Sequence, residues 1–530
     1  MNMSSDLKTI QKCIMGFAKR SEKVSSEILA KTFVDTEPLA DVIHTKNSQI
    51  VYGRRGTGKT HALLYLAEQV NRGGDYAIYI DLRSIGSDGS IYNDDRLSLA
   101  ERSSRLIIDV LNAIAGHLFE VAVSAISTAL HPQQISLRVD DFEKAISEVR
   151  VVGETTALVR EAATSQSVSE VHADFSVRDG SLALGGKSSG NFGHESERHM
   201  QNVGKQRVSV NFGRVQGTLR SLLSVLSPGT FWVLFDEWSE IPVDLQPYLA
   251  DLLRRTLMPV ENVVVKIGAI EHRSLFYLPG ERGEYVGLEL GADISADINL
   301  DDFLVFESNQ HRSLQFFKNL FYRHLQAGGD FADVKSADQL VQLLFTQVNA
   351  FEELVRASEG VPRDALNLAT KVVTKAFGNK ASVVDVRTAA RDWYLQDKAS
   401  PVNSNVVLSS ILEFIIDYVI GQRKARAFLV KSGSRDSHID RLYDARVIHT
   451  LKKNISSHDE PGVRYDAFKI DYGCYVELIN TQKAPAGLFQ TDAFDYIDVP
   501  VDDYRSIRRA ILNAEDILRI ESGLFGNSAC

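Results

Sequence analysis

The stretch Asn47–Glu68, NSQIVYGRRGTGKTHALLYLAE, decides the fold of this chain. A short apolar run, Ile50–Tyr52, reads as a strand and leads into the loop Gly53–Thr60, and a helical pattern of apolar residues follows. The loop fits the phosphate-binding pattern G-x-x-x-x-G-K-[ST], with the strand before it and the helix after it that the pattern requires. A glycine-rich turn that binds nothing is the weaker interpretation of a complete pattern in this context. The stretch therefore predicts a site for a nucleoside triphosphate.

The residues of this loop have separate expected roles. Its glycines allow backbone angles that are closed to other residues, and they let backbone N–H groups approach phosphate oxygens. The start of the following helix adds a positive dipole end at the same point. Lys59 is expected to reach the β- and γ-phosphates, and the Thr60 hydroxyl to take one site on Mg²⁺. The expected nucleotide-binding residues are Gly53, Arg54, Arg55, Gly56, Thr57, Gly58, Lys59 and Thr60.

Length, charge and cysteine content limit the class of protein. A chain of 530 residues is expected to hold about three domains of ~100–200 residues each. The net charge of −10 restricts any nucleic-acid contact to a local basic patch. Cys13, Cys474 and Cys530 lie far apart, as is typical of a protein from a reducing compartment. Long apolar runs and a secretory signal are both missing from the sequence, so we expect no membrane span and a cytoplasmic location.

A second apolar strand pattern, Thr230–Phe235, runs directly into Asp236 and Glu237. Such a strand end is a weak signal alone, but it becomes a strong one downstream of a phosphate-binding loop. Asp236 is expected to hold Mg²⁺ through water, and Glu237 to orient or deprotonate the attacking water. The predicted metal-binding residues are therefore Thr60 and Asp236, and Glu237 is the predicted catalytic base.

The order of strands and helices predicts an α/β fold. The strand patterns Tyr76–Asp81 and Asn262–Ile270 alternate with helices, which indicates a doubly wound parallel sheet with its ligand at the carboxyl ends of the strands. Beyond Asp301 the strand signals vanish and helices run to about Asp397, forming a helical lid. From Asn403 onward a helix, a short strand, a second helix and a strand or hairpin over Tyr465–Leu478 follow the order of a winged helix.

These patterns divide the chain into four expected parts. Residues 1–32 form an N-terminal helical segment, 33–300 the nucleotide-binding domain, 301–397 the lid and 398–530 the winged-helix-like domain. Residues 132–213 are expected to be an insertion, since a Ser- and Gly-rich stretch there holds a hairpin signal at Asp179-Gly180. A surface loop without a special purpose is an equally good interpretation of that insertion.

With both nucleotide motifs, the helix start Gly360-Val361-Pro362-Arg363 and the winged-helix-like end, the chain resembles an AAA+ P-loop ATPase. The resemblance is to the initiator branch, which includes origin-recognition and replication-initiation ATPases. It implies ATP and Mg²⁺ as cofactors, ATP hydrolysis, and a sensor 2 role for Arg363 at the γ-phosphate. It also implies an arginine finger donated to the ATP of a neighbouring subunit, for which Arg282 is the first candidate and Arg273 the second.

The chain departs from the family pattern at one position. Sensor 1 is usually an asparagine after a strand, and the corresponding residue here is Glu271. A carboxylate would repel the γ-phosphate unless it were neutralised, so Glu271 is expected to face Arg273 or Arg363 instead. Slow hydrolysis is the expected consequence.

The resemblance predicts an ATP-dependent oligomerising switch that binds and slowly hydrolyses ATP and engages DNA through its winged-helix-like domain. The alternative is a STAND-like signalling or antiphage-defence ATPase, which senses a trigger and activates a separate effector protein. A helicase or DNA-cleaving enzyme has little support, because the sequence shows no second cluster of metal-binding carboxylates. The basic residues that weakly support DNA contact are Arg423, Lys424, Arg426, Lys431, Arg435, Arg441, Arg446, Lys452 and Lys453.

Overall fold

The structure is a computed structural model. It describes residues 3–17, 24–36, 38–86, 91–126, 132–147, 210–226, 229–281, 283–301, 310–423, 425–433, 436–456, 461–474, 476, 510–521 and 523. The expected hairpin at Asp179-Gly180 and the finger candidate Arg282 lie outside these residues.

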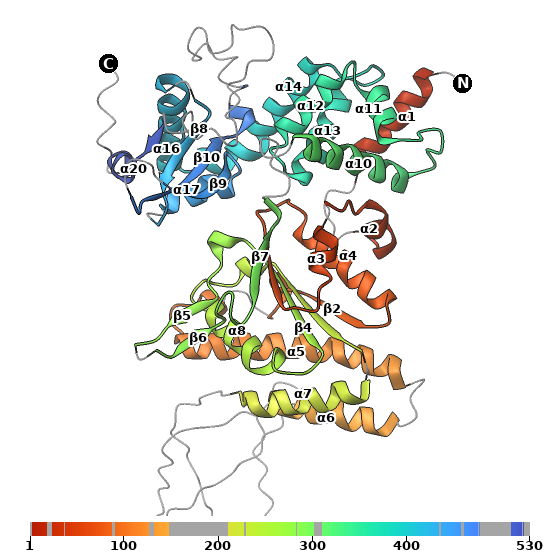
Figure 1. Cartoon of the computed structure of the whole chain (residues 1–530), viewed down its shortest axis with the longest axis vertical. Coiled ribbons are helices and arrows are strands. Elements are labelled where there is room, and N and C mark those ends of the chain that lie inside the picture. Colours follow the sequence, from red (N-terminus) through yellow and green to blue (C-terminus); the bar gives the residue numbers. More distant parts are fainter. Residues whose placement is uncertain are drawn as a thin grey trace, which may run out of the picture.

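A parallel sheet forms the centre of the nucleotide-binding domain, in the lower part of Figure 1. Its strand order is β2-β3-β4-β1-β7, and each neighbouring pair is parallel. Parallel strands are normally buried on both faces, and every residue of β3 and β4 is buried here. The expected α/β fold is confirmed. The strands are β1 (Gln49–Tyr52), β2 (Tyr76–Asp81), β3 (Phe231–Asp236), β4 (Val263–Ala269) and β7 (Ser295–Asn299).

Helices cover both faces of this sheet, because successive side chains of a strand point to opposite sides. On β3, Trp232 and Leu234 pack with α3 (Leu39–Ile43) and α4 (Lys59–Arg72). Phe231, Val233 and Phe235 of the same strand belong to the larger core on the other face. That core is built with α5 (Leu99–Ile126), α7 (Phe212–Leu226) and α8 (Gln246–Leu252), and α8 continues as a π-helical turn over Leu253–Leu257.

Helix α5 is long and apolar enough, by length and composition alone, to cross a membrane, and 39% of its most apolar window is buried. Its apolar face packs within the core, with Leu106, Val110, Leu111 and Ile114 all buried. A buried core helix of this kind passes the same test, so α5 is weak evidence for a membrane span.

The first part of the expected insertion belongs to the core. Helix α6 (Pro132–Ser147) lies against α5 and α7 and buries Ile135, Val139 and Phe142. A boundary at residue 132 therefore cuts through packed structure. A deletion that spares this packed helix should begin after Ser147.

Three strands follow β4 that the sequence analysis did not predict. The hairpin β5 (Tyr277–Pro279) and β6 (Tyr285–Gly287) packs near α8, and β7 completes the sheet beside β1. A signal for β7 existed, since Ile294, Ala296, Ile298 and Leu300 alternate with polar residues. The strand brings the chain back to the carboxyl edge of the sheet at Asp301.

The lid is helical, as expected from the sequence, and it includes the N-terminal helix α1 (Met3–Met15). Ile10, Ile14 and Phe17 are part of the lid's apolar core, and α1 contacts α10 and α13. The N-terminal segment thus packs as a component of the lid. The lid helices are α10 (Gln310–Gly328), α11 (Ala337–Leu344), α12 (Val348–Ala357), α13 (Pro362–Lys375) and α14 (Val383–Trp393), and α2 (Ser26–Thr32) packs between α4 and α10.

The C-terminal domain has the expected order of helix, strand, helix and hairpin. The hairpin itself differs from the prediction, because its arms are β9 (Ile448–Ser456) and β10 (Arg464–Ile470). The strand predicted over Tyr465–Leu478 therefore ends early, where Asp471 turns the chain by accepting a hydrogen bond from the Gly473 backbone. The other elements are α16 (Val406–Ile416), β8 (Ala427–Lys431), α17 (Ser437–Asp444), β11 (Ile511–Leu512) and α20 (Ala514–Glu521).

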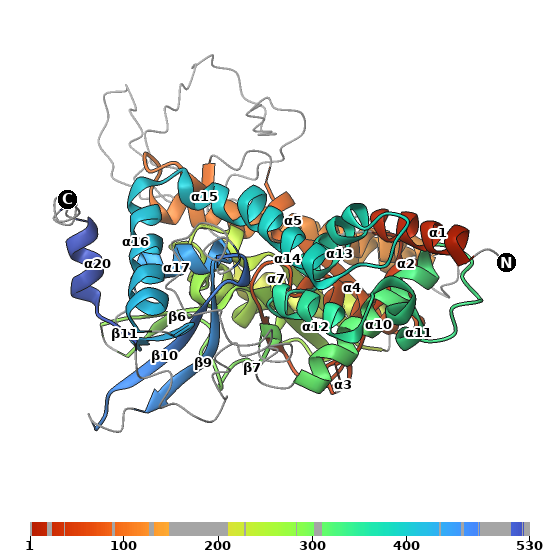
Figure 2. The same ribbon diagram turned by 90° about the horizontal axis from the view of Figure 1, so that it is seen from above.

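The lid and the C-terminal domain lie side by side above the carboxyl edge of the parallel sheet (Figure 1). Figure 2 shows the same arrangement from above, with α1 and α20 at opposite ends of this upper layer. Both upper parts therefore lie on the side of the sheet where a ligand would be bound.

Candidate nucleotide site

The phosphate-binding loop has backbone angles that require glycine. Gly56 has φ of 92° and Gly58 has φ of 100°, both in the left-handed region. A Cβ atom on Gly56 would lie 3.0 Å from Val361 and 3.1 Å from the Cβ of Arg363. Glycine at position 56 thus lets the lid approach the loop closely.

Lys59 begins helix α4 and is buried with its ammonium group inside the loop. Its Nζ donates hydrogen bonds to the carbonyl oxygens of Gly53 at 2.6 Å and Arg54 at 3.2 Å. Burial lowers the pKa of Lys59, while Asp236 and Glu237 oppose that shift. The ammonium group is held where phosphate oxygens could replace the two carbonyls as its partners.

Thr60 and Asp236, the predicted metal-binding pair, lie in direct contact. The Thr60 hydroxyl donates a hydrogen bond of 2.6 Å to Asp236 Oδ2, and the Tyr79 hydroxyl donates another at 2.8 Å. Asp236 is buried. A hydroxyl and a carboxylate are oxygen ligands of the kind that Mg²⁺ prefers in phosphate sites, so these residues fit that ion.

Glu237 lies beside this pair and lines the same cavity. Its φ of 55° is in the left-handed region, and its backbone N–H donates to Asp236 Oδ1 at 2.8 Å. Burial and the neighbouring Asp236 raise the pKa of Glu237. A raised pKa makes a carboxylate a better proton acceptor, which suits the predicted role as a base.

Arg83 is a residue of the site that the sequence analysis missed. It follows β2, lines the cavity, and lies 3.7 Å from Glu237 Oε1 while also pairing with Asp81. The available signal was its position directly after the strand Tyr76–Asp81, at the edge where ligands bind.

These groups border a cavity of about 580 Å³, a volume within the usual range for small-molecule sites. Arg55, Gly56, Gly58, Lys59, Thr60, Glu237 and Arg363 of the predicted set line it. Helices α1, α2 and α10 form an opposite wall that the sequence analysis did not anticipate. The rings of Phe17 and His324 meet there at a tilt of 52°, with centroids 5.4 Å apart. Ile28, Leu29, Leu320 and Leu366 complete the apolar part.

The lid contributes Arg363 to this cavity from the start of α13. Its backbone N–H donates to the carbonyl of Gly56 at 3.2 Å, which ties the lid to the loop. Arg55 also borders the cavity and pairs with Glu240 at 2.6 Å.

Arg54 and Glu271 do not line this cavity. Both line a second cavity of about 270 Å³, between the sheet edge and the C-terminal domain. Glu271 pairs with Lys453 and accepts a hydrogen bond of 3.2 Å from Asn299. The expectation that Glu271 faces Arg273 or Arg363 is wrong, because β9 brings a lysine to it from the C-terminal domain. Arg273 instead lies 3.8 Å from Asp444.

Comparison with known proteins connects this geometry to a family. Residues 17–82, which contain the phosphate-binding loop, match the family model described as ORC-CDC6-like. A comparison with curated proteins finds no match.

Two solved structures are similar over most of the chain. The ORC1 protein of Aeropyrum pernix in complex with DNA has 15% identity and a TM-score of 0.28, covering 83% of this chain and 89% of that one. Drosophila ORC bound to DNA has 10% identity and a TM-score of 0.28, covering 86% and 92%. Similarity at this level carries no argument about function. Residues 17–82 therefore resemble the ORC-CDC6-like family, and the parallel sheet with its phosphate-binding loop has the α/β P-loop ATPase fold.

Proposed function

We propose that this protein is an initiator-type AAA+ switch that binds Mg²⁺-ATP, hydrolyses it slowly and assembles with copies of itself in the cytoplasm. The observation that carries the proposal is the convergence of Lys59, Thr60, Glu237 and Arg363 on one cavity, with Asp236 directly behind Thr60. These side chains come from the loop, the sheet edge and the lid. A nucleotide bound among them contacts all three parts, so its presence or absence is transmitted to the lid.

Each residue has a distinct role in the proposed reaction. The loop N–H groups and Lys59 bind the phosphates, and Thr60 and Asp236 hold Mg²⁺. Mg²⁺ supplies charge neutralisation on the phosphate oxygens when it is bound. Glu237 orients water and accepts its proton. Arg363 contacts the γ-phosphate from the lid, so loss of that phosphate releases the lid.

The proposed assembly completes one subunit's site with Arg282 of the next. A charge-assisted hydrogen bond of this kind contributes about 1.5–3 kcal/mol, enough to strengthen an otherwise weak interface. Arg282→Ala should therefore lose ATP-dependent oligomers and ATPase activity together while the protomer still binds ATP. Light scattering with a slowly hydrolysed ATP analogue and a steady-state ATPase assay measure both effects.

Mixing supplies the control for this prediction. Arg282→Ala and Lys59→Ala proteins should recover activity when combined, because the mixed interface pairs a working loop with an intact finger. A protein that remains monomeric with saturating ATP, or mixtures without recovery, would contradict completion of the site between subunits.

DNA is the proposed partner of the C-terminal domain, although part of its basic cluster is already paired. Arg446 pairs with Asp364 and Asp397, and Lys453 pairs with Glu271. Lys424 and Arg435 lie outside the described residues. Lys431 and Lys452 of the same cluster are exposed, and they are the proposed contacts with DNA.

Affinity for a short DNA duplex should fall as salt is raised, because binding releases counterions from the phosphates. Replacing Lys431 and Lys452 together with alanine should weaken binding and flatten the salt dependence, as fluorescence anisotropy can measure. Lys371→Ala on the lid is the matched control and should leave both unchanged. Assembly that does not change with added DNA, but that requires a foreign protein or nucleic acid as its trigger, would favour the signalling alternative with a separate effector protein.

A further inference from the structure

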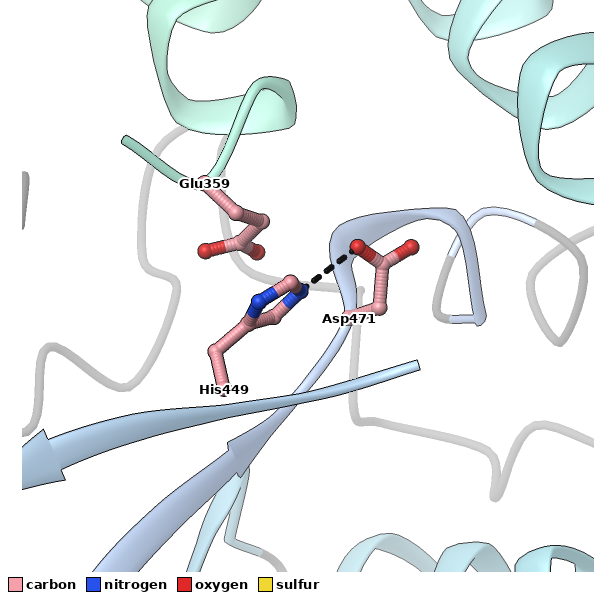
Figure 3. Close-up of side chains that lie close together, drawn as sticks. All are labelled: Glu359, His449 and Asp471. Atoms are coloured by element: carbon pink, nitrogen blue, oxygen red, sulfur yellow. Dashed lines mark hydrogen bonds and ion pairs between the residues drawn. The ribbon is translucent and has the colours of Figure 1, made fainter. Parts of the chain in front are cut away.

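A cluster of buried charged residues joins the lid to the C-terminal domain. Glu359 of the lid, His449 of β9 and Asp471 after β10 lie together in Figure 3, with ligand atoms within 4.8 Å of one another. These are residue types that bind metals. The cluster already contains cationic side chains, however, since Lys398 Nζ lies 2.6 Å from Asp471 and Lys469 pairs with Glu359. It is therefore an ion-pair network of the protein itself.

Arg54 of the phosphate-binding loop is part of this network. Its guanidinium donates to the Glu359 carbonyl at 2.7 Å and to Nδ1 of His449. Its Nε lies 2.9 Å from Asp301, and its backbone N–H donates to the same carboxylate at 2.8 Å. The side chain is only 7% exposed. One arginine thus contacts the nucleotide-binding domain, the lid and the C-terminal domain together.

The protonation of His449 suits this arrangement. Burial and the charge of Arg54 lower its pKa well below the ordinary value, so the ring is neutral. Neutral His449 accepts from Arg54 at Nδ1 and donates from Nε2 to Asp471 at 2.8 Å. Docking takes these groups out of water, and the hydrogen bonds and ion pairs among them offset that cost only while the domains stay together.

The lid turn that receives Arg54 leads directly into the nucleotide cavity. Glu359 has φ of 53°, a strained conformation for a residue with a side chain. The Tyr472 backbone N–H donates to its carboxylate at 3.0 Å, so the C-terminal domain also holds this turn. Arg363 lies four residues further along.

Around the buried network, three contacts connect the sheet edge to the C-terminal domain. Glu271 pairs with Lys453, with side chains 41% and 36% exposed. His272 lies 2.7 Å from Asp444, and the Tyr443 hydroxyl donates to Asp301 at 3.2 Å. The first pair is exposed enough to be altered without disturbing a core.

We propose that the C-terminal domain is a latch on the phosphate-binding loop. In its docked position it fixes Arg54, and through Arg54 the loop and the lid turn, in the shape that receives a nucleotide. Lys59 donates to the Arg54 carbonyl, so the position of Arg54 bears directly on the lysine that binds phosphate. By linkage, a bound nucleotide strengthens docking and release of the domain loosens the nucleotide. The inference rests on the proposed nucleotide site.

The test alters the exposed pair in the full chain. Lys453→Glu places two carboxylates against each other, and it should speed release of a fluorescent ATP analogue about fivefold, the scale of one exposed ion pair. Small-angle X-ray scattering should show a larger radius of gyration. The exchanged pair, Glu271→Lys with Lys453→Glu, should restore slow release and the compact form. Lys380→Glu makes the same charge change at an exposed residue of the lid near α1 and should leave release unchanged.

Tyr443→Phe provides a second variant, since it removes only the hydroxyl that bonds to Asp301. Combined with Lys453→Glu, it should speed release further. Unchanged release in a chain whose domains have separated would overturn the latch. Equal acceleration by Lys380→Glu, or an unchanged radius of gyration in the combined variant, would also overturn it. Failure of the wild-type protein to bind any nucleotide would instead defeat the proposed site, and the scattering measurement would still report on docking.

Discussion

Lys59→Ala should abolish tight ATP binding while leaving the fold intact. The ammonium group is the charge that the loop directs at the phosphates, and hydrogen bonds to charged groups contribute about 1.5–3 kcal/mol each. Loss of two such bonds corresponds to an affinity lower by about 10²–10⁴-fold. Isothermal titration calorimetry with Mg²⁺-ATP measures the change.

Two controls accompany this variant. Lys371→Ala removes a lysine of the lid that bonds to Gln396 at the surface, and it should bind ATP as the wild type does. Thermal melting should show that Lys59→Ala remains folded, because the lysine contacts only loop carbonyls through its ammonium group. Undiminished affinity in a folded Lys59→Ala protein would refute the site.

Glu237→Gln should keep ATP bound but lower the hydrolysis rate by at least about 100-fold, the usual contribution of a positioned base. The amide preserves the shape of the side chain and cannot accept the proton of water. Its position beside Asp236 and Thr60 makes the loss specific to the chemical step. Single-turnover hydrolysis of bound ATP measures that step separately from product release.

Glu240→Gln is the matched control for this prediction. Glu240 lines the same cavity and pairs with Arg55, so its loss tests whether any nearby carboxylate has the same effect. We expect a much smaller change in rate for it. An equal loss in both variants would show that the charge of the cavity matters more than a base at position 237.

The structure changes the expected source of slow hydrolysis. Glu271 was expected to disturb the γ-phosphate, but it belongs to the second cavity and pairs with Lys453. Replacing it would therefore act first on the contact between domains. A direct effect of Glu271 on the γ-phosphate is therefore no longer the expected cause of slow hydrolysis.

The sequence by itself determined the parts of the site whose residues lie close together along the chain or at the ends of predicted strands. The loop Gly53–Thr60 has its chemistry within eight consecutive positions, so its pattern specifies both the backbone shape and the ligand class. Asp236 could be placed beside Thr60 because parallel strands bring their carboxyl ends to one edge. The start of α13 at Pro362 was predictable from the fixed backbone angle of proline.

Only the tertiary structure decided which distant segments meet. Phe17 and His324 form one wall of the cavity although 307 positions separate them in the sequence. Arg54 has the sequence context of a nucleotide ligand, but its side chain turns toward Glu359 and His449 instead. A local pattern encodes backbone geometry within a few residues, whereas the direction of a long side chain depends on which charges the fold brings near it. For this protein those charges lie in the lid and the C-terminal domain, and they join the phosphate-binding loop to both.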